Sequence, residues 1–197
     1  MDRKNAGILL FNDVELLDFA GPYEVFSTTF FTDSEEPAFL VRTVSQLGEI
    51  ITSRNGLKVI PDSTIFDAHD LDILIVPGGY GAEKVEIHNG VLVEWIRSQA
   101  GRAETIASVC TGAFLLAKAG LLSGREATTH WKRIDILQRQ YPDIGMVRDR
   151  TYVDTGKVVT SGGVAAGIAM SLHLVERYVG REAALETARD MEYNGDF

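Results

Sequence analysis

Short, largely apolar runs alternate along this chain with segments of helical pattern. The apolar runs cover residues 6–11, 39–44, 71–76 and 104–109, and the helical segments cover residues 18–26, 90–99, 110–119, 134–139 and 164–178. A short run with few polar positions is typical of a strand that is covered on both faces. The alternation therefore predicts an α/β fold, with a mainly parallel central sheet and helices on both of its faces.

Turn residues refine this pattern at four places. Residues 50–60 predict a hairpin around Asn55-Gly56, because Asn-Gly supplies the positive backbone angles of a tight turn, and residues 151–160 predict a second hairpin. Gly120 suits a left-handed cap at the end of the helix over 110–119. An aspartate ahead of a proline, Asp18 before Pro22, indicates the start of the first helix.

Length, composition and charge restrict the class of protein. A chain of 197 residues with 45% apolar residues fits a single domain over residues 1–197. No apolar run approaches the roughly 18–20 residues of a membrane span. A net charge of −9, with scattered lysines and arginines, disfavours nucleic acid as a partner. The lone cysteine forms no intramolecular disulfide and the chain has no metal motif, so we expect a cytoplasmic protein without a metal or cofactor.

The lone cysteine, Cys110, stands between a predicted buried strand and a predicted helix. Ser108 and Gly112 flank it at a distance of two residues, which meets the steric requirement of a nucleophile elbow. The helix amino terminus is expected to lower the pKa of the thiol and favour the thiolate. The alternative is that Cys110 is only a small, buried apolar residue, but the elbow context favours a nucleophile.

Two glycines follow the strand over residues 71–76. Gly78 and Gly79 lie where open parallel sheets place their ligand crevices, and free backbone amides there are expected to hold an oxyanion or a substrate anion. The plainer interpretation of this Pro-Gly-Gly segment is a turn after a strand.

Asp18 can reach the same edge of the sheet, because it follows the first predicted strand. A carboxylate there can donate a proton or activate water, although an aspartate ahead of a helix is more often a cap. Glu24 is a second choice for this role, and Glu15 is expected to be solvated.

Among the four histidines, His130 is the best candidate base for a Cys–His pair. His69, His88 and His173 occupy ordinary loop or helix positions. Nothing in the spacing fixes the distance from His130 to the thiol, so a structural histidine bonded to a backbone carbonyl is the favoured interpretation.

Four segments in this order carry a resemblance: Pro77-Gly78-Gly79, the cysteine elbow, Ala127-Thr128-Thr129-His130-Trp131 and Gly162-Gly163. With them the chain resembles the ThiJ/PfpI superfamily, which has the fold of class I glutamine amidotransferases, over nearly its whole length. The segments 17–22, 108–112, 120–124 and 191–193 are most similar to those of isonitrile hydratases.

The resemblance implies a flavodoxin-like three-layer sandwich, a homodimer and a small-molecule substrate. It implies an enzyme that hydrates an isocyanide to an N-substituted formamide. Cys110 would attack the terminal carbon, and Asp18 would deliver a proton and guide water onto the adduct. Thr111 would hold Cys110 or Asp18 by hydrogen bonding, while Gly79 and Val164 would line the pocket.

Departures from related patterns leave two alternatives open. Peptidases of the superfamily carry histidine directly after the cysteine, where this chain has Thr111, and no later His–Glu pair of the amidotransferase kind follows Gly163. Ligand-sensing domains of AraC-type regulators share the Cys-Thr-Gly and Thr-Thr-His-Trp segments. The alternatives are therefore a non-catalytic ligand or redox sensor, and a glyoxalase-like or deglycase-like enzyme that acts on reactive carbonyls.

Overall fold

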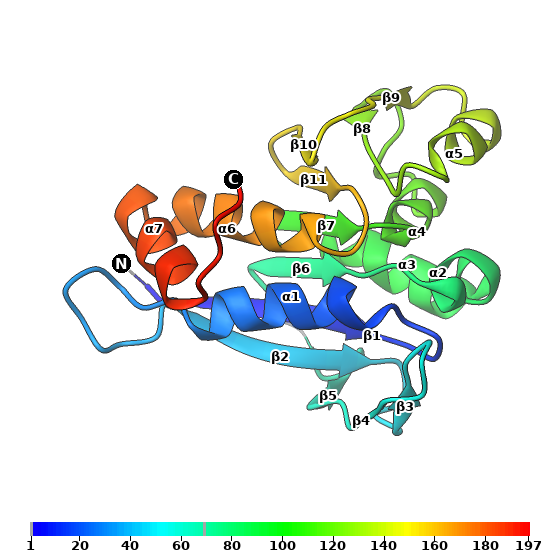
Figure 1. Ribbon diagram of the computed structural model, residues 1–197. Helices are drawn as coiled ribbons and strands as arrows, with labels where there is room; N and C mark the ends of the chain where they lie inside the picture. The colour runs from blue at the N-terminus through cyan, green and yellow to red at the C-terminus, as the bar shows by residue number, and fades with distance from the viewer. Residues whose placement is uncertain (1, 69) are drawn as a thin grey trace.

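A seven-stranded sheet forms the centre of the molecule (Figure 1). The computed structural model describes residues 2–68 and 70–197. Every neighbouring pair of strands in this sheet is parallel except β10 and β11, which form an antiparallel hairpin. In spatial order the strands are β10 (Tyr152–Asp154), β11 (Val158–Ser161), β7 (Thr105–Val109), β6 (Ile73–Val76), β1 (Lys4–Leu10), β2 (Phe39–Ser45) and β5 (Ser63–Thr64).

Helices cover both faces of the sheet, which gives three layers (Figure 1). On one face α1 (Leu16–Ser27) packs against α6 (Ala166–Tyr178), and α6 packs against α7 (Arg181–Asp190). On the other face α2 (Tyr80–Lys84) and α3 (Gly90–Gln99) pack against α4 (Gly112–Lys118), with the short η1 (Glu86–His88) between them. The predicted flavodoxin-like α/β sandwich is thereby confirmed.

Smaller elements lie at the margins of the sandwich (Figure 1). The hairpin of β3 (Ile51–Thr52) and β4 (Lys58–Val59) is antiparallel and lies below the end of β2 in this view. A further region combines α5 (Ile134–Gln140) with the two-residue strands β8 (Glu126–Ala127) and β9 (Gly145–Met146).

The central strands are buried because they are apolar throughout. All four residues of β6 and all five residues of β7 are buried. Burial of apolar surface contributes about 25 cal/mol per Å² to the free energy of folding, and it is the main stabilising contribution in such a core. Within the described part of the chain, no helix is both long and apolar enough to cross a membrane.

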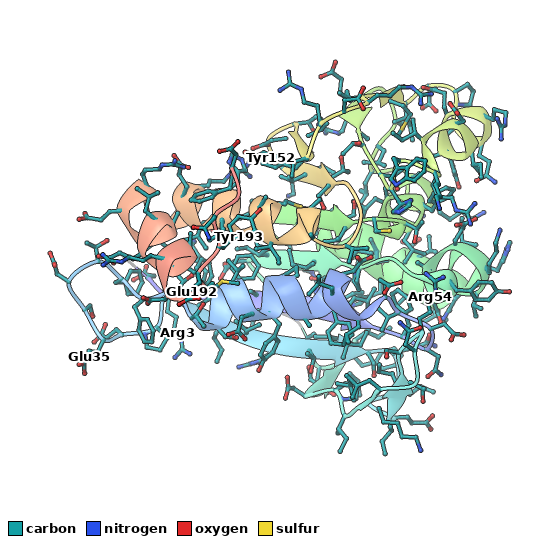
Figure 2. The ribbon with its side chains drawn as sticks, viewed as in Figure 1. Arg3, Glu35, Arg54, Tyr152, Glu192 and Tyr193 are labelled. Atoms are coloured by element: carbon teal, nitrogen blue, oxygen red, sulfur yellow. The ribbon has the colours of Figure 1, made fainter. Side chains whose placement is uncertain are left out.

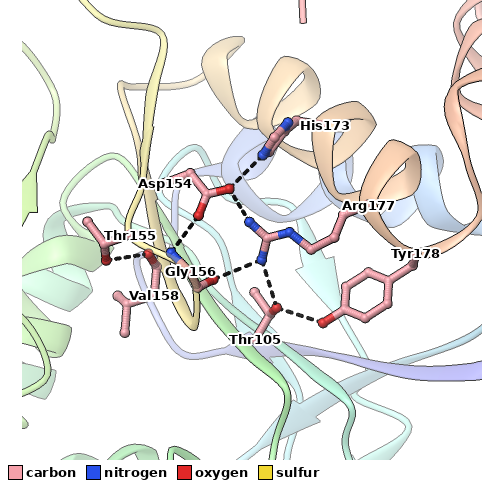
Figure 3. Close-up of polar contacts among 8 residues, drawn as sticks. All are labelled: Thr105, Asp154, Thr155, Gly156, Val158, His173, Arg177 and Tyr178. Carbon is pink, nitrogen blue, oxygen red and sulfur yellow. Dashed lines mark hydrogen bonds and ion pairs between the residues drawn. The ribbon is translucent and has the colours of Figure 1, made fainter.

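A polar network fastens the β10–β11 hairpin to α6 (Figure 3). The Asp154 carboxylate shares a hydrogen bond of 2.8 Å with the ring of His173 and forms an ion pair with Arg177. Arg177 also donates to the carbonyl of Gly156 at 2.9 Å. These contacts give His173 a structural role, as expected for its helical position.

Two local predictions need correction. The first helix begins at Leu16, not at Asp18, and Pro22 lies inside it. Pro22 has no N–H to donate to the Asp18 carbonyl, yet the helix continues past it to Ser27. In the β3–β4 turn Gly56 has a φ of +92°, whereas Asn55 does not take a positive φ.

Candidate active site

Four parallel strands end at one edge of the sheet, and each is followed by a residue of the candidate site. Asp18 follows β1, Gly78 follows β6, Cys110 follows β7 and Val164 follows β11. Because the carboxyl ends of parallel strands meet at the same edge, residues that are far apart in the sequence converge there. The predicted site residues are therefore brought together by topology.

Cys110 has the backbone geometry of a nucleophile elbow. Its φ is +57°, a left-handed value that is uncommon for a residue with a side chain. Its N–H donates to the Gly162 carbonyl at 3.0 Å, and its carbonyl accepts from Thr129 Oγ1 at 2.6 Å. A Cβ atom on Gly112 would lie only 2.0 Å from the Val76 carbonyl oxygen. The predicted need for a small residue at this position is thus confirmed.

The carboxyl group of Asp18 is completely buried and joins two other segments. One oxygen accepts from the Gly78 N–H at 3.0 Å, and the other accepts from the Val164 N–H at 3.1 Å. The alternative interpretation of Asp18 as a helix cap is wrong, since both of its partners lie outside α1. Burial is the main cause that raises the pKa of Asp18 to about 7, while the two amides act in the opposite direction.

The thiol of Cys110 is also buried, with 7% of the residue exposed. Burial, and next the negative charge of Asp18, raise the pKa of this thiol to about 12. The amide and hydroxyl of Thr111 oppose the rise but do not cancel it. The expectation of a lowered thiol pKa is therefore wrong, because loss of hydration and a neighbouring carboxylate outweigh the partial charge of the helix end.

The amides of Gly78 and Gly79 are engaged by side chains. Gly78 donates to Asp18, and the Gly79 N–H donates to Thr111 Oγ1 at 2.9 Å. The expectation of free amides for an anion is wrong at both positions, since their partners come from α1 and from the cysteine elbow. The Thr111 hydroxyl also donates to the Gly79 carbonyl at 3.2 Å, and it lowers the pKa of the Cys110 thiol.

Val164 is a backbone ligand of the carboxyl group. Its φ of +56° is an outlier for a β-branched residue, and this conformation turns its N–H toward Asp18. Sequence reasoning predicted that Val164 would line a pocket but missed its donor role. The Gly162-Gly163 pair directly before it is the only local sign of unusual backbone at this point.

A cleft of about 370 Å³ opens onto the thiol. Figure 2 labels Arg54, which reaches this edge of the sheet from the turn between β3 and β4. Residues of the candidate site line the cleft together with charged side chains, which form its rim. It is lined by Glu15, Arg54, Gly79, Tyr80, Glu83, Lys84, Cys110, Thr111, His130, Lys132, Arg133 and Val164.

His130 lies beside the thiol. A Cβ atom on Gly163 would lie 2.3 Å from His130 Cδ2 and 3.4 Å from Cys110 Sγ, so the ring and the sulfur flank the same glycine. His130 Nδ1 accepts from the Lys132 N–H at 3.3 Å. The predicted bond to a backbone carbonyl is replaced by this bond to a backbone amide. Burial, and then the neighbouring cations, lower the pKa of His130.

The two other candidate carboxylates, Glu24 and Glu15, lie in different environments. Glu24 is exposed and does not line the cleft, because it lies six residues beyond Asp18 and so on another side of α1. Glu15 is not simply solvated: it lines the cleft and pairs with Arg54 Nη1 at 2.9 Å. His88 ends η1, and His69 lies outside the described residues.

Over residues 2–68 and 70–197, no group of three or more His, Cys, Asp or Glu side chains is placed to hold a metal ion. What the site does hold is a thiol that lines the cleft and, beside it, a buried carboxyl group, and each of the two groups shifts the pKa of the other. Such a pair can form a covalent adduct and move a proton to or from it.

Comparisons with characterised proteins point to enzymes and regulators alike. Isonitrile hydratase of Pseudomonas putida is 38% identical over 189 residues, which span 95% of this chain and 77% of that protein. The transcriptional regulator GbdR of Pseudomonas aeruginosa is 30% identical over 179 residues, which span 91% of this chain. This chain spans only 48% of that regulator.

Solved structures share the whole architecture. A ThiJ/PfpI family protein from Pseudomonas syringae superposes with a TM-score of 0.88 at 26% identity, covering 100% of this chain and 78% of that one. Drosophila melanogaster DJ-1beta gives a TM-score of 0.85 at 22% identity, covering 98% of this chain and all of its own. The model of the DJ-1/PfpI family matches residues 4–177. This chain therefore belongs to the DJ-1/PfpI family.

Proposed function

We propose that this protein hydrates an isocyanide to an N-substituted formamide, with Cys110 as the nucleophile and Asp18 as the group that moves protons. The observation that carries the proposal is a buried carboxyl group next to the only thiol: Asp18 accepts from the Val164 N–H, and Cys110 Sγ flanks the preceding residue, Gly163. The 38% identity to an isonitrile hydratase supports the choice of substrate.

The titration of the pair suits the first step. A thiol with a pKa of about 12 holds its proton at neutral pH, while the Asp18 carboxyl group, with a pKa of about 7, is present in both forms. The carboxylate takes the thiol proton as the sulfur bonds to the terminal carbon of the isocyanide. It then delivers that proton to the same carbon, which gives a thioimidate with an N=CH–S unit and restores the carboxylate. A group that titrates near the working pH is well matched to such a transfer.

Water then releases the product. The Asp18 carboxylate accepts a proton from water as the oxygen bonds to the thioimidate carbon, and this proton goes on to the nitrogen. The resulting tetrahedral adduct collapses when its hydroxyl proton passes through Asp18 to the departing sulfur. The carbon–sulfur bond breaks, the thiol is regenerated and the formamide leaves. One water molecule is consumed for each isocyanide.

The small exposed fraction of Cys110 also fits an isocyanide substrate. Only 7% of Cys110 is exposed, so a bulky electrophilic carbon meets the walls of the cleft before it meets the sulfur. An isocyanide is linear at its reacting end and its terminal carbon carries no substituent. That carbon can reach a recessed sulfur while the rest of the molecule stays in the cleft of about 370 Å³.

Formamide production from cyclohexyl isocyanide tests the proposal. We expect the wild-type protein to form N-cyclohexylformamide, and Cys110→Ala to lower kcat/KM by more than about 1000-fold because the adduct no longer forms. We expect Asp18→Asn to cost about 100-fold or more, since proton transfer is lost. Glu24→Gln, which changes an exposed carboxylate on the same helix, is the matched control and leaves turnover unchanged. Turnover that survives Cys110→Ala contradicts the mechanism.

A ligand-sensing role is the second candidate, and the similarity to GbdR over 91% of this chain favours it. A sensor binds its ligand without consuming it. Isothermal titration with an isocyanide, followed by mass spectrometry of the mixture, separates the two roles: intact ligand after saturable binding supports a sensor, and formamide supports the enzyme. Redox sensing through Cys110 is disfavoured by its raised thiol pKa, because the thiolate is the form that peroxide oxidises.

A further inference from the structure

The rim of the cleft is positive, although the protein as a whole is negative. The net charge of the chain is −9. The charged side chains that line the cleft are the cations Arg54, Lys84, Lys132 and Arg133 and the carboxylates Glu15 and Glu83. With more cations than carboxylates at its mouth, the cleft is a local exception to the charge of the molecule.

Both rim carboxylates are already paired. Glu83, whose side chain is 8% exposed, contacts Lys84 Nζ and Arg133 Nε, each at 2.9 Å. Glu15 contacts Arg54 Nη1 at 2.9 Å. Each guanidinium group therefore uses one nitrogen on a carboxylate and has no other side-chain or backbone acceptor among the described residues. Guanidinium groups bind carboxylates best through two parallel N–H bonds, so each retains capacity for an anion.

Among the described residues, Lys132 is the rim cation that forms no ion pair with a carboxylate. Within the part of the chain that the structure describes, no carboxylate lies within 4.0 Å of its ammonium group, which instead lies 4.9 Å from the centre of the Trp131 ring. Its backbone N–H holds the His130 ring at 3.3 Å. The ammonium group thus lies over Trp131, whose ring is stacked with that of His130, and Lys132 lines the cleft.

The effect of the cations is directed into the cleft. After burial, Lys132, Arg133 and Arg54 lower the pKa of His130, and Glu15 acts in the opposite direction. His130 and Cys110 Sγ flank the same glycine, Gly163. A ligand that reaches the sulfur through the cleft therefore passes the rim cations.

We propose that the cleft selects substrates that carry a carboxylate at the end remote from the reacting carbon, and that Lys132 and Arg133 bind this carboxylate. The inference rests on the proposed function for the identity of the reacting group. It goes beyond that function by assigning an anion subsite and two specificity-determining residues. The substrate carboxylate replaces water around the Lys132 ammonium group and accepts hydrogen bonds from the Arg133 nitrogens that do not contact Glu83.

Two isocyanides that differ in one charge test the proposal: 4-isocyanobenzoate and its methyl ester. We expect kcat/KM to be about tenfold higher for the acid, which is the size of effect that one charge-assisted hydrogen bond gives. Lys132→Gln should remove most of this preference and leave the ester unaffected. Lys157→Gln changes an exposed lysine in the β10–β11 turn, outside the cleft, and should retain the preference. Added salt should weaken the turnover of the acid only.

Equal kcat/KM values for the acid and the ester overturn the proposal. So does a preference that Lys132→Gln leaves intact. Arg133→Gln is the second variant, and we expect it to act in the same direction as Lys132→Gln.

A readout without turnover keeps the anion subsite separate from the proposed function. Iodoacetate and iodoacetamide alkylate thiols and differ mainly in charge, so the ratio of their rates at Cys110 reports the potential in the cleft. We expect this ratio to fall about threefold or more in Lys132→Gln and to stay constant in Lys157→Gln. If no isocyanide is hydrated but the ratio falls, the proposed function fails and the anion subsite stands. A ratio that does not change in Lys132→Gln refutes the subsite.

Discussion

A fully buried carboxyl group makes the stability of this protein depend on pH. The pKa of Asp18 is about 7 in the folded protein and 3.8 for an unperturbed aspartate. Between these values the folded state binds more protons at this residue than the unfolded state does. Stability from Asp18 is therefore complete below about pH 4 and is lost as the pH rises toward 7, by up to about 4 kcal/mol.

Urea unfolding at pH 5 and pH 8 measures this dependence. We expect the unfolding free energy of the wild type to carry a contribution that falls with pH, and Asp18→Asn to remove that contribution. Glu24→Gln, which alters an exposed carboxyl group, should keep the wild-type slope. An identical slope in Asp18→Asn would show that Asp18 does not hold a raised pKa.

Single residues show how far sequence reasoning reached at the site. The position of Cys110 in an elbow was predictable, because it depends on neighbours along the chain such as Gly112. The engagement of the Gly78 amide was not, because its partner lies 60 residues away in α1. The direction of the thiol pKa was missed for the same reason: it depends on burial and on Asp18, which no local pattern reveals.

At the scale of elements, the junction of β7 and α4 depends on close contact with the end of β6. A Cβ atom on Gly112 would lie 2.0 Å from the Val76 carbonyl oxygen and 2.9 Å from that of Pro77. Both are backbone atoms, so relief requires movement of the helix or of the strand end. We expect Gly112→Ala to destabilise the protein by at least about 1–3 kcal/mol and to displace Cys110.

Thermal and urea unfolding of Gly112→Ala provide the measurement. Gly90→Ala is the matched control, since a Cβ atom at this first residue of α3 would meet nothing within 4 Å. We expect this control to change the unfolding free energy by about 1 kcal/mol or less. A Gly112→Ala protein as stable as the control would contradict the close contact.

A helix or strand was predictable where its segment is long and apolar enough to show a hydrophobic periodicity. The helix over residues 90–99 agrees with α3 at both ends, and the buried strands were identified within a few residues. Two-residue strands such as β5 and β8 carry too few positions to show any period. The helix α7 was missed because it buries a face of small residues around Ala184 and has little apolar signal.

For the whole molecule, the resemblance predicts a homodimer, and the surface offers a place for one. Large apolar side chains are exposed around the β3–β4 hairpin and β5: Leu47, Ile50, Leu57, Ile60 and Phe66 are each 50–72% exposed. Figure 1 shows these elements together at one corner of the sandwich. Large apolar side chains that are exposed on neighbouring elements are typical of an interaction site.

Light scattering during size-exclusion chromatography tests the prediction. We expect the wild type to have twice the chain mass of 21.6 kDa. Ile60→Asp, which places a charge on this surface, should shift the mass toward that of one chain, whereas Lys157→Gln should not. A wild-type mass of one chain at every concentration would exclude the homodimer.

The Asp18 carboxyl group bonds to amides that lie 60 and 146 residues further along the chain. No single peptide contains the reactive pair together with the amides that orient it. An attempt to graft this chemistry onto another scaffold as a loop would transfer the sulfur but leave its partner behind. The smallest transferable unit is the set of four strand ends, in their native spacing.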